Sequence, residues 1–519
     1  MKRSILLTGL CYALACGAAA CAGDDSDEAE ESSSSKTSMP SGEGSESSKA
    51  SEDDKVATAN AMVPVPTEVK VSHPPDAGKA FSASTIDYDK YGYKQAEYFI
   101  EGGATNFSVT GGAAADGKFV LGEKSRAAFK SRVLVRLPKD TSKFNGTVIV
   151  EWLNVSGGVD ADPGFMYNLD LITREGYGWV GVSAQSVGIQ GGGINIGAIL
   201  GGANAPKITP LKELSPERYG SLNHPGDSYS YDIFSTAGSI IREPKGVDVM
   251  EGLETKHLIA YGESQSAGRM VSYVNGVHPI AKVYDAFFIH SRGAAGAGFD
   301  DSGLGLPGFG GAAPEHIRDD IDEKVFQFQT ETDVTGMLAF FPARQPDTDK
   351  LITWEVAGTA HADKYLVDFN ADNPMGMVDC PNANNGPQYR VIRAALHSLD
   401  AWMREGTEPP HGKVLEADAS GKSVRDENGN AKGGVRSPDV DVPIATLSGD
   451  STDASGFFCF IFGSTTPFTP EKLMKLYPTH EDYVQKVKDA AEATLKAGFI
   501  LEPEAKGFVS DAEKAAVPN

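Results

Sequence analysis

The fold of this chain is decided by the stretch HLIAYGESQSAGRM, residues 257–270. Residues 257–261 are apolar enough for a central strand that is covered on both faces. The next five residues, Gly-Glu-Ser-Gln-Ser, run directly into residues 267–271, which are compatible with a helix. An abrupt turn from strand to helix with a serine at its apex is typical of a nucleophile elbow.

Two serines compete for the apex of this turn. The backbone of such a turn is strained, so small residues are needed two positions before and two positions after the serine. With Ser264 at the apex these positions hold Gly262 and Ser266, and with Ser266 they hold Ser264 and Gly268. We favour Ser264 because it directly follows the apolar run. A serine-rich turn in an ordinary βα unit has the same pattern, so the prediction depends on the rest of the chain.

The N-terminal part of the 519-residue chain is typical of a lipoprotein signal. Lys2 and Arg3 precede a short apolar run, which predicts a signal peptide over residues 1–20. The sequence Ala-Ala-Ala-Cys that ends at Cys21 resembles the lipobox of bacterial lipoproteins and predicts lipidation of that thiol; Cys16 is a second candidate. We therefore expect an extracytoplasmic protein that a lipid holds on a bacterial membrane, and of the bacterial membranes we favour the outer one.

An acidic, serine-rich segment follows and predicts a disordered tether over residues 21–63. Residues 22–55 hold eleven acidic residues and three lysines, so −8 of the formal charge of −24 belongs to this segment. The remaining −16 belongs to the rest of the chain, including the domain expected at residues 64–519, where no basic stripe offers to neutralise phosphates. The sequence therefore argues against a nucleic-acid partner.

Strand-like runs alternate with helix-compatible stretches along this domain, which indicates an α/β fold with a mostly parallel sheet and helices on both faces. We expect strands at residues 98–109, 130–137, 147–153, 177–184, 257–261, 283–290, 325–329 and 352–356, the first two of them half-exposed. Helical stretches are expected at residues 165–174, 394–403 and, in two pieces, 468–501. The long irregular stretch at residues 186–246 predicts a lid or pocket wall inserted before the elbow strand.

A serine needs a base to take its proton and an acid to orient that base. Behind a nucleophile elbow these partners follow in the order acid, then histidine. Asp333 follows the strand expected at residues 325–329 and is the predicted acid, with Glu331 as the alternative. His361 follows the strand at residues 352–356 on a loop of small residues and is the predicted base.

Three other histidines fit this role less well: His224 lies in the insertion, His290 ends a strand too early, and His397 lies on a helix. The negative charge that forms on the substrate carbonyl needs two backbone donors. We expect the first donor to be the amide of Gln265. The second should come from residues 154–156, with Val155 at their centre, in a loop that Gly157 and Gly158 allow to approach closely.

No motif in the sequence calls for a metal or a dinucleotide cofactor, since H-E-x-x-H and C-x-x-C are missing and no G-x-G-x-x-G follows an expected strand. We expect neither. Three of the five cysteines lie in the signal region, which leaves Cys380 and Cys459 in the domain. A disulfide between them and two buried free thiols are both compatible with the sequence.

Several segments together resemble the bacterial α/β-hydrolase-domain family of secreted proteins with a Gly-x-Ser-Gln-Ser elbow. They are VEWLNVS (150–156), RYG (218–220), HPGD (224–227), GESQS (262–266), QTETDV (329–334), AGTAH (357–361) and GGVRSPDVDVP (433–443). The resemblance covers the chain from about Tyr93 onward. It implies hydrolase chemistry, with Ser264 as nucleophile, His361 as base and either Glu331 or Asp333 as acid.

The sequence thus predicts a serine hydrolase of small-molecule carboxylic esters. A surface lipoprotein that binds a ligand without turnover is the alternative from another class. Peptidase and acyltransferase activity are alternatives on the same three residues.

Overall fold

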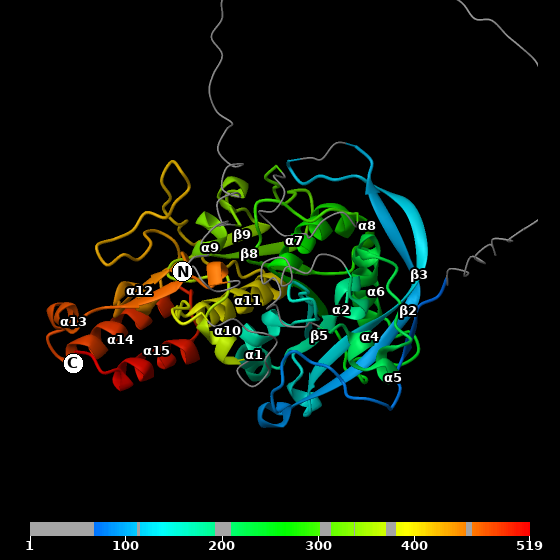
Figure 1. Cartoon of the computed structure of the whole chain (residues 1–519), viewed down its shortest axis with the longest axis horizontal. Coiled ribbons are helices and arrows are strands. Elements are labelled where there is room, and N and C mark those ends of the chain that lie inside the picture. The colour runs from blue at the N-terminus through cyan, green and yellow to red at the C-terminus, as the bar shows by residue number, and fades with distance from the viewer. Residues whose placement is uncertain are drawn as a thin grey trace, which may run out of the picture. The chain divides into compact units, whose positions relative to one another are not determined.

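The computed structural model of the protein describes residues 67–111, 115–192, 209–300, 313–336, 338–369, 380–452 and 459–518 (Figure 1). The predicted signal peptide, the lipidation site at Cys21 and the tether lie outside the described residues. Within the described ranges, no helix has the length and apolar character needed to cross a membrane.

One large sheet carries the domain. In spatial order its strands are β1 (Lys70–Ser72), β2 (Tyr93–Val109), β3 (Leu121–Pro138), β5 (Gly178–Val182), β4 (Thr147–Trp152), β6 (His257–Glu263), β7 (Ala286–His290), β8 (Lys324–Thr330) and β9 (Leu351–Val356). All pairs from β5 to β9 are parallel, whereas β1, β2, β3 and β5 pair antiparallel. The expected mostly parallel sheet is confirmed. A second, small sheet pairs β10 (Ala445–Ser448) with β11 (Ser464–Pro467).

Helices connect these strands. They are α1 (Pro163–Glu175), α2 (Ser186–Gln190), α4 (Leu211–Leu214), α5 (Pro216–Tyr219), α6 (Ser230–Arg242), α7 (Gln265–Ser272), α8 (His278–Ala281), α9 (Glu331–Thr335), α10 (Lys364–Phe369), α11 (Gln388–Glu405), α12 (Pro438–Asp441), α13 (Pro470–Leu476), α14 (His480–Lys496) and α15 (Glu502–Lys514). Short 3-10 turns are η1 (Tyr88–Tyr91), η2 (Thr141–Lys143), η4 (Asp227–Tyr229), η6 (Phe341–Ala343) and η7 (Cys459–Ile461), and a π-helical turn, η5 (Tyr273–Val277), continues α7.

Both faces of the sheet are buried. Successive side chains of a strand point to opposite faces, so neighbouring residues of one strand pack into different cores. Val148 and Val150 of β4 pack into a core with apolar residues of α6 and α7. Ile149 packs into another core with residues of α1 and α11, and this core continues into α14 and α15. Figure 1 shows the β2–β3 hairpin on one side of the parallel strands and α13 to α15 on the other. Burial on both faces explains why these strands read as continuous apolar runs.

The second strand of the β2–β3 hairpin differs from the half-exposed strands that were expected, whereas the first alternates buried and partly exposed residues from 101 to 106. The second strand was expected at residues 130–137, yet residues 131–138 are buried throughout. Arg132 has no exposed surface and pairs with Glu97 at 3.1 Å and with Asp160 at 2.8 Å. Charged groups are tolerated in a protein interior when they are paired and hydrogen-bonded. The polar positions of this strand therefore mark buried ion pairs and not a solvent-facing side.

The stretch at residues 186–246 is more regular than expected. Residues 193–208 lie outside the described residues, but Ser230–Arg242 form α6, which the sequence reading missed. Ile233, Ala237 and Ile240 of α6 are buried in the core at helical spacing, and the serines between them obscured this period. The expectation of an irregular insertion is wrong for this part. The role of a lid or pocket wall stays a prediction for the remainder.

Cys380 and Cys459 form a disulfide, which decides between the two possibilities left open by the sequence. The bond ties the segment after α10 to η7. Two residues beyond Cys459, the carbonyl of Ile461 accepts a hydrogen bond from the amide of Ala362 at 3.1 Å. The disulfide therefore supports the loop that carries His361.

Replacing both cysteines by serine is expected to lower the free energy of unfolding by about 4.5 kcal/mol, because the chain-entropy model gives this value for a loop of the observed length. The bridged residues are 79 positions apart. Urea unfolding of the oxidised protein and of the double variant measures the difference. Reduction of the wild-type protein should produce the same loss of stability. The same treatment of the double variant should leave its stability unchanged. Equal stability of all samples would contradict the prediction.

Candidate active site

The carboxyl ends of β4 and β6 lie at a topological switch point of the sheet. The chain leaves β4 through α1 toward β5 on one side and leaves β6 through α7 toward β7 on the other. Switch points of this kind are the usual ligand sites of open α/β sheets. The loops after β4, β6, β8 and β9 deliver all the side chains proposed above to this edge.

Ser264 stands at the apex of a sharp turn between β6 and α7. Its φ is 58° and its ψ is −117°, a backbone conformation that residues other than glycine rarely adopt. The turn closes so tightly that a Cβ atom at Gly262 would lie 2.5 Å from the carbonyl oxygen of Ser266. The amide of Ser264 donates to the carbonyl of His290 at 2.9 Å, which anchors the turn to β7. Ser264 is partly exposed, whereas Ser266 is fully buried.

Ser264, His361 and Asp333 form a continuous hydrogen-bonded row. The Oγ of Ser264 lies 2.7 Å from Nε2 of His361, and Nδ1 of His361 lies 2.7 Å from Oδ1 of Asp333. An ionised carboxylate only accepts hydrogen bonds, so the proton of the neutral imidazole belongs on Nδ1. Nε2 is then free to accept the proton of the serine hydroxyl. This arrangement suits a nucleophile, its base and the group that orients the base.

Asp333 is oriented by the start of α9. Its Oδ2 accepts the amide hydrogen of Thr330 at 2.7 Å, while the Oγ1 of Thr330 accepts the amide hydrogen of Asp333 at 3.4 Å. This reciprocal pair is a capping box, which satisfies donors at the helix N-terminus and leaves Oδ1 directed at His361. Asp333 has no exposed surface, so water does not compete for its carboxylate.

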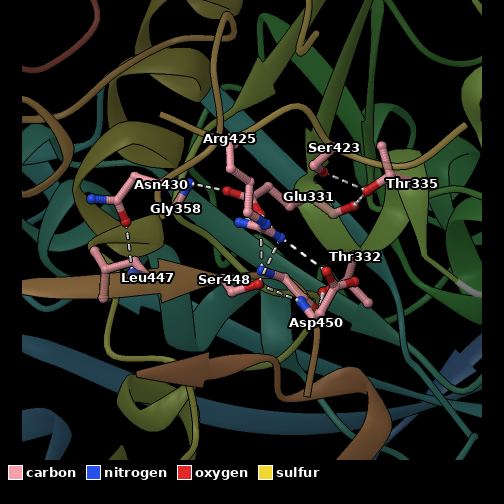
Figure 2. Close-up of polar contacts among 12 residues, drawn as sticks. Glu331, Thr332, Thr335, Gly358, Ser423, Arg425, Asn430, Leu447, Ser448 and Asp450 are labelled. Carbon is pink, nitrogen blue, oxygen red and sulfur yellow. Dashed lines mark hydrogen bonds and ion pairs between the residues drawn. The ribbon is translucent and has the colours of Figure 1, made fainter. Parts of the chain in front are cut away.

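Glu331, the alternative acid, points elsewhere. Its carboxylate accepts the amide hydrogens of Gly358 at 2.6 Å and Gly449 at 3.0 Å and lies 3.4 Å from Arg425. Figure 2 shows Gly358 and Arg425 beside Glu331. Glu331 and Asp333 are two residues apart on α9, and two helical steps turn a side chain by more than half a revolution. Glu331 therefore ties the loop before His361 to the chain around β10, and Asp333 reaches the imidazole.

His361 is held in an environment that favours its protonated form. Burial alone would lower its pKa, but the charge of Asp333 and the hydrogen bond to it, followed by the charge of Glu263, outweigh burial and raise the pKa above its ordinary value. A raised pKa makes the imidazole a stronger base toward Ser264.

The other histidines considered in the sequence make different contacts. His290 is fully buried, its Nδ1 lies 2.9 Å from the hydroxyl of Tyr261, and burial lowers its pKa to about 3. His224 Nε2 donates to the carbonyl of Ala184 at 2.8 Å. His397 pairs with Glu175 at 2.9 Å. None of these three contacts involves Ser264.

Two backbone amides are placed as candidates for an oxyanion hole. Gln265 is the first residue of α7, and the amides of the first helical turn have no acceptor within their helix. In the loop after β4 the amide of Asn154 donates to the carbonyl of Ala161, and that of Ser156 donates to the side chain of Asn154. Of the three amides considered there, Val155 is the one left for a substrate.

The sequence reading missed Glu263, which ends β6 directly before the serine. Its Oε1 lies 3.8 Å from Nε2 of His361, and its Oε2 accepts a hydrogen bond from Nδ2 of Asn154 at 3.0 Å. Burial raises its pKa to about 7. One signal in the sequence could have identified Glu263. It is a carboxylate directly before the proposed nucleophile, and the residue next to that serine must also lie close to the base.

A family model described as an alpha/beta hydrolase domain matches residues 63–510, in agreement with this architecture. Similar solved structures include an α/β serine hydrolase without a lid from Xanthomonas campestris, 12% identical, covering 47% of this chain and 85% of its own, with a TM-score of 0.28. A dienelactone hydrolase described as putative, from Klebsiella pneumoniae, is 13% identical and covers 59% of this chain and 99% of its own, with a TM-score of 0.26. A fungal esterase from Rhizomucor miehei is 13% identical and covers 59% and 85%, with a TM-score of 0.29. No curated protein sequence matches.

Proposed function

Because this chain belongs to the family of alpha/beta hydrolase domains, we propose that it is a serine hydrolase that cleaves small carboxylic esters. The observation that supports the proposal most is the row of hydrogen bonds from Ser264 through His361 to Asp333. Three residues from three separate loops rarely meet in this order without a catalytic reason.

In the proposed reaction, Oγ of Ser264 attacks the ester carbonyl and its proton passes to Nε2 of His361. Asp333 stabilises the imidazolium that forms. The amides of Gln265 and Val155 donate to the negatively charged oxygen of the tetrahedral intermediate. His361 then protonates the departing alcohol, which leaves an acyl group on Ser264. Water, deprotonated by His361, hydrolyses this acyl-enzyme and restores the serine.

The proposed place of this reaction is outside the cytoplasm of a bacterium, at the outer membrane. The signal-like residues 1–20 and the lipobox that ends at Cys21 support this proposal. The acidic segment over residues 21–63 would then hold the domain at a distance from the lipid, because a charged, self-repelling chain is extended.

A fluorophosphonate probe tests the proposed nucleophile, because such probes react with a serine that is activated by a base and an oxyanion hole. We expect the purified protein to be labelled on the tryptic peptide of residues 257–269, and fragmentation of this peptide should place the label on Ser264 and not on Ser266. The Ser264→Ala variant should take no label. A folded, unlabelled wild-type protein would instead support a ligand-binding role without turnover.

A further inference from the structure

A second carboxylate approaches the base on the side opposite Asp333. Asp333 contacts Nδ1 of His361 at 2.7 Å, whereas Oε1 of Glu263 lies 3.8 Å from Nε2. We propose that Glu263 is a positioning residue that stabilises the imidazolium of His361 during the attack by Ser264 and thereby sets the pH dependence of the reaction. The inference rests on the proposed serine hydrolase and assigns a further residue to its site.

The carboxylate of Glu263 is held in place by the loop after β4. Nδ2 of Asn154 donates to both the backbone carbonyl and Oε2 of Glu263, at 3.1 and 3.0 Å. Asn154 is itself fixed by a pair of backbone hydrogen bonds with Ala161. Since Oε2 is engaged by Asn154, Oε1 is the atom that faces His361. Glu263 is only 6% exposed, so this geometry is shielded from water.

Few of the groups around Glu263 carry a charge near neutral pH. The titratable side chains that face it are His361 after β9, Asp333 on α9, Tyr167 on α1, Tyr261 on β6 and His290 at the end of β7. Burial raises the pKa of both tyrosines well above the ordinary value and lowers that of His290, so these three groups are neutral. Glu263 therefore interacts mainly with His361 and, repulsively, with Asp333.

The distance decides which state of His361 gains from Glu263. At 3.8 Å the two side chains do not form a good hydrogen bond, but two opposite charges at this distance in a buried site attract strongly. The attraction exists only after Nε2 has taken a proton and while Glu263 is ionised. Glu263 thus favours the state formed during the attack over the resting state, which is the condition for accelerating a chemical step.

The sign of the pH effect follows from this attraction. The ionised Glu263 raises the pKa of His361, as Asp333 does. Activity requires neutral His361, so its loss on acidification marks the pKa of this group. Removing the charge of Glu263 lowers that pKa, and the acidic limb of the kcat/KM profile should move to lower pH. The two groups are coupled, so the limb belongs to the pair and not to either residue alone.

The Glu263→Gln variant tests the proposal in the full-length protein with p-nitrophenyl butyrate as substrate. We expect the acidic limb of kcat/KM to move down by about 0.5 to 1 pH unit and the plateau to fall roughly 3- to 10-fold, since one pKa unit corresponds to a factor of ten. The Glu263→Asp variant keeps the charge but withdraws it by one methylene, so its limb should fall between those of the other two proteins.

Glu151→Gln serves as the matched control. Glu151 is another buried glutamate in the sheet, but it accepts hydrogen bonds from Gly164, Phe165 and Trp179 and does not face His361. This variant should lose stability and keep the position of the acidic limb. A limb that stays in place in Glu263→Gln, whether or not activity falls, overturns the inference alone. Wild-type protein that neither hydrolyses the ester nor takes a fluorophosphonate overturns the proposed hydrolase and this inference with it.

Discussion

Replacing Ser264 by alanine is expected to lower kcat for p-nitrophenyl butyrate by about 10⁴- to 10⁶-fold, the range seen when the nucleophile of a serine hydrolase is removed. The loss is large because no other hydroxyl is placed at Nε2 of His361, the atom 2.7 Å from Ser264 Oγ, in the part of the chain that the structure describes. Steady-state kinetics at saturating substrate measure the effect, and circular dichroism checks that the variant is folded.

Ser266→Ala is the matched control for this change. The hydroxyl of Ser266 is buried and has no hydrogen-bond partner among the described residues, so its removal should change kcat less than threefold by the usual size of such effects. Alanine is also small enough for the tight turn. The opposite pattern, with Ser264→Ala active and Ser266→Ala inactive, would mean that the register of the elbow is wrong.

Replacing Asp333 by asparagine is expected to lower kcat by about 10⁴-fold with little change in stability, as removal of the orienting charge does in serine proteases. The asparagine amide would meet Nδ1 of His361 where Oδ1 of Asp333 now accepts at 2.7 Å. The imidazole would then place its proton on Nε2, and it could no longer take the proton of Ser264. Kinetics across pH 5 to 9 measure the loss.

Glu331→Gln separates the two candidate acids. Glu331 binds the amides of Gly358 and Gly449 and pairs with Arg425, so its neutralisation should lower the melting temperature. Well below that temperature kcat should fall less than tenfold, because the row from Ser264 to Asp333 stays intact. If Glu331→Gln lost activity as Asp333→Asn is expected to do, the assignment of the acid would be refuted.

Much of the fold could be predicted from the sequence, because its signals are local. An apolar run that ends in Gly-Glu-Ser shows a buried strand and a tight turn within ten residues, and the strands at residues 325–329 and 352–356 are read in the same way. The order of these segments placed Asp333 or Glu331 and then His361 after successive strands. Helix α6 was missed because its buried positions are interrupted by serines.

Contacts between distant segments lay beyond the sequence, and the site depends on them. The choice between Asp333 and Glu331 depends on where α9 begins, since the capping box of Thr330 fixes which side chain turns toward His361. The burial of Arg132 depends on Asp160, which the β4–β5 connection brings to β3. Local periodicity cannot report such pairings, because their partners are far apart in the chain.

The sequence by itself determined the α/β class, the strand-to-helix elbow at residues 262–266 and the order of the residues proposed to act with it, because each is written in neighbouring residues. Only the tertiary structure decided that Asp333 and not Glu331 meets His361, that Cys380 and Cys459 are bonded, and that Glu263 lies beside the imidazole. These outcomes depend on helix phase, loop closure and sheet order, which fix distances between residues that the chain itself keeps far apart.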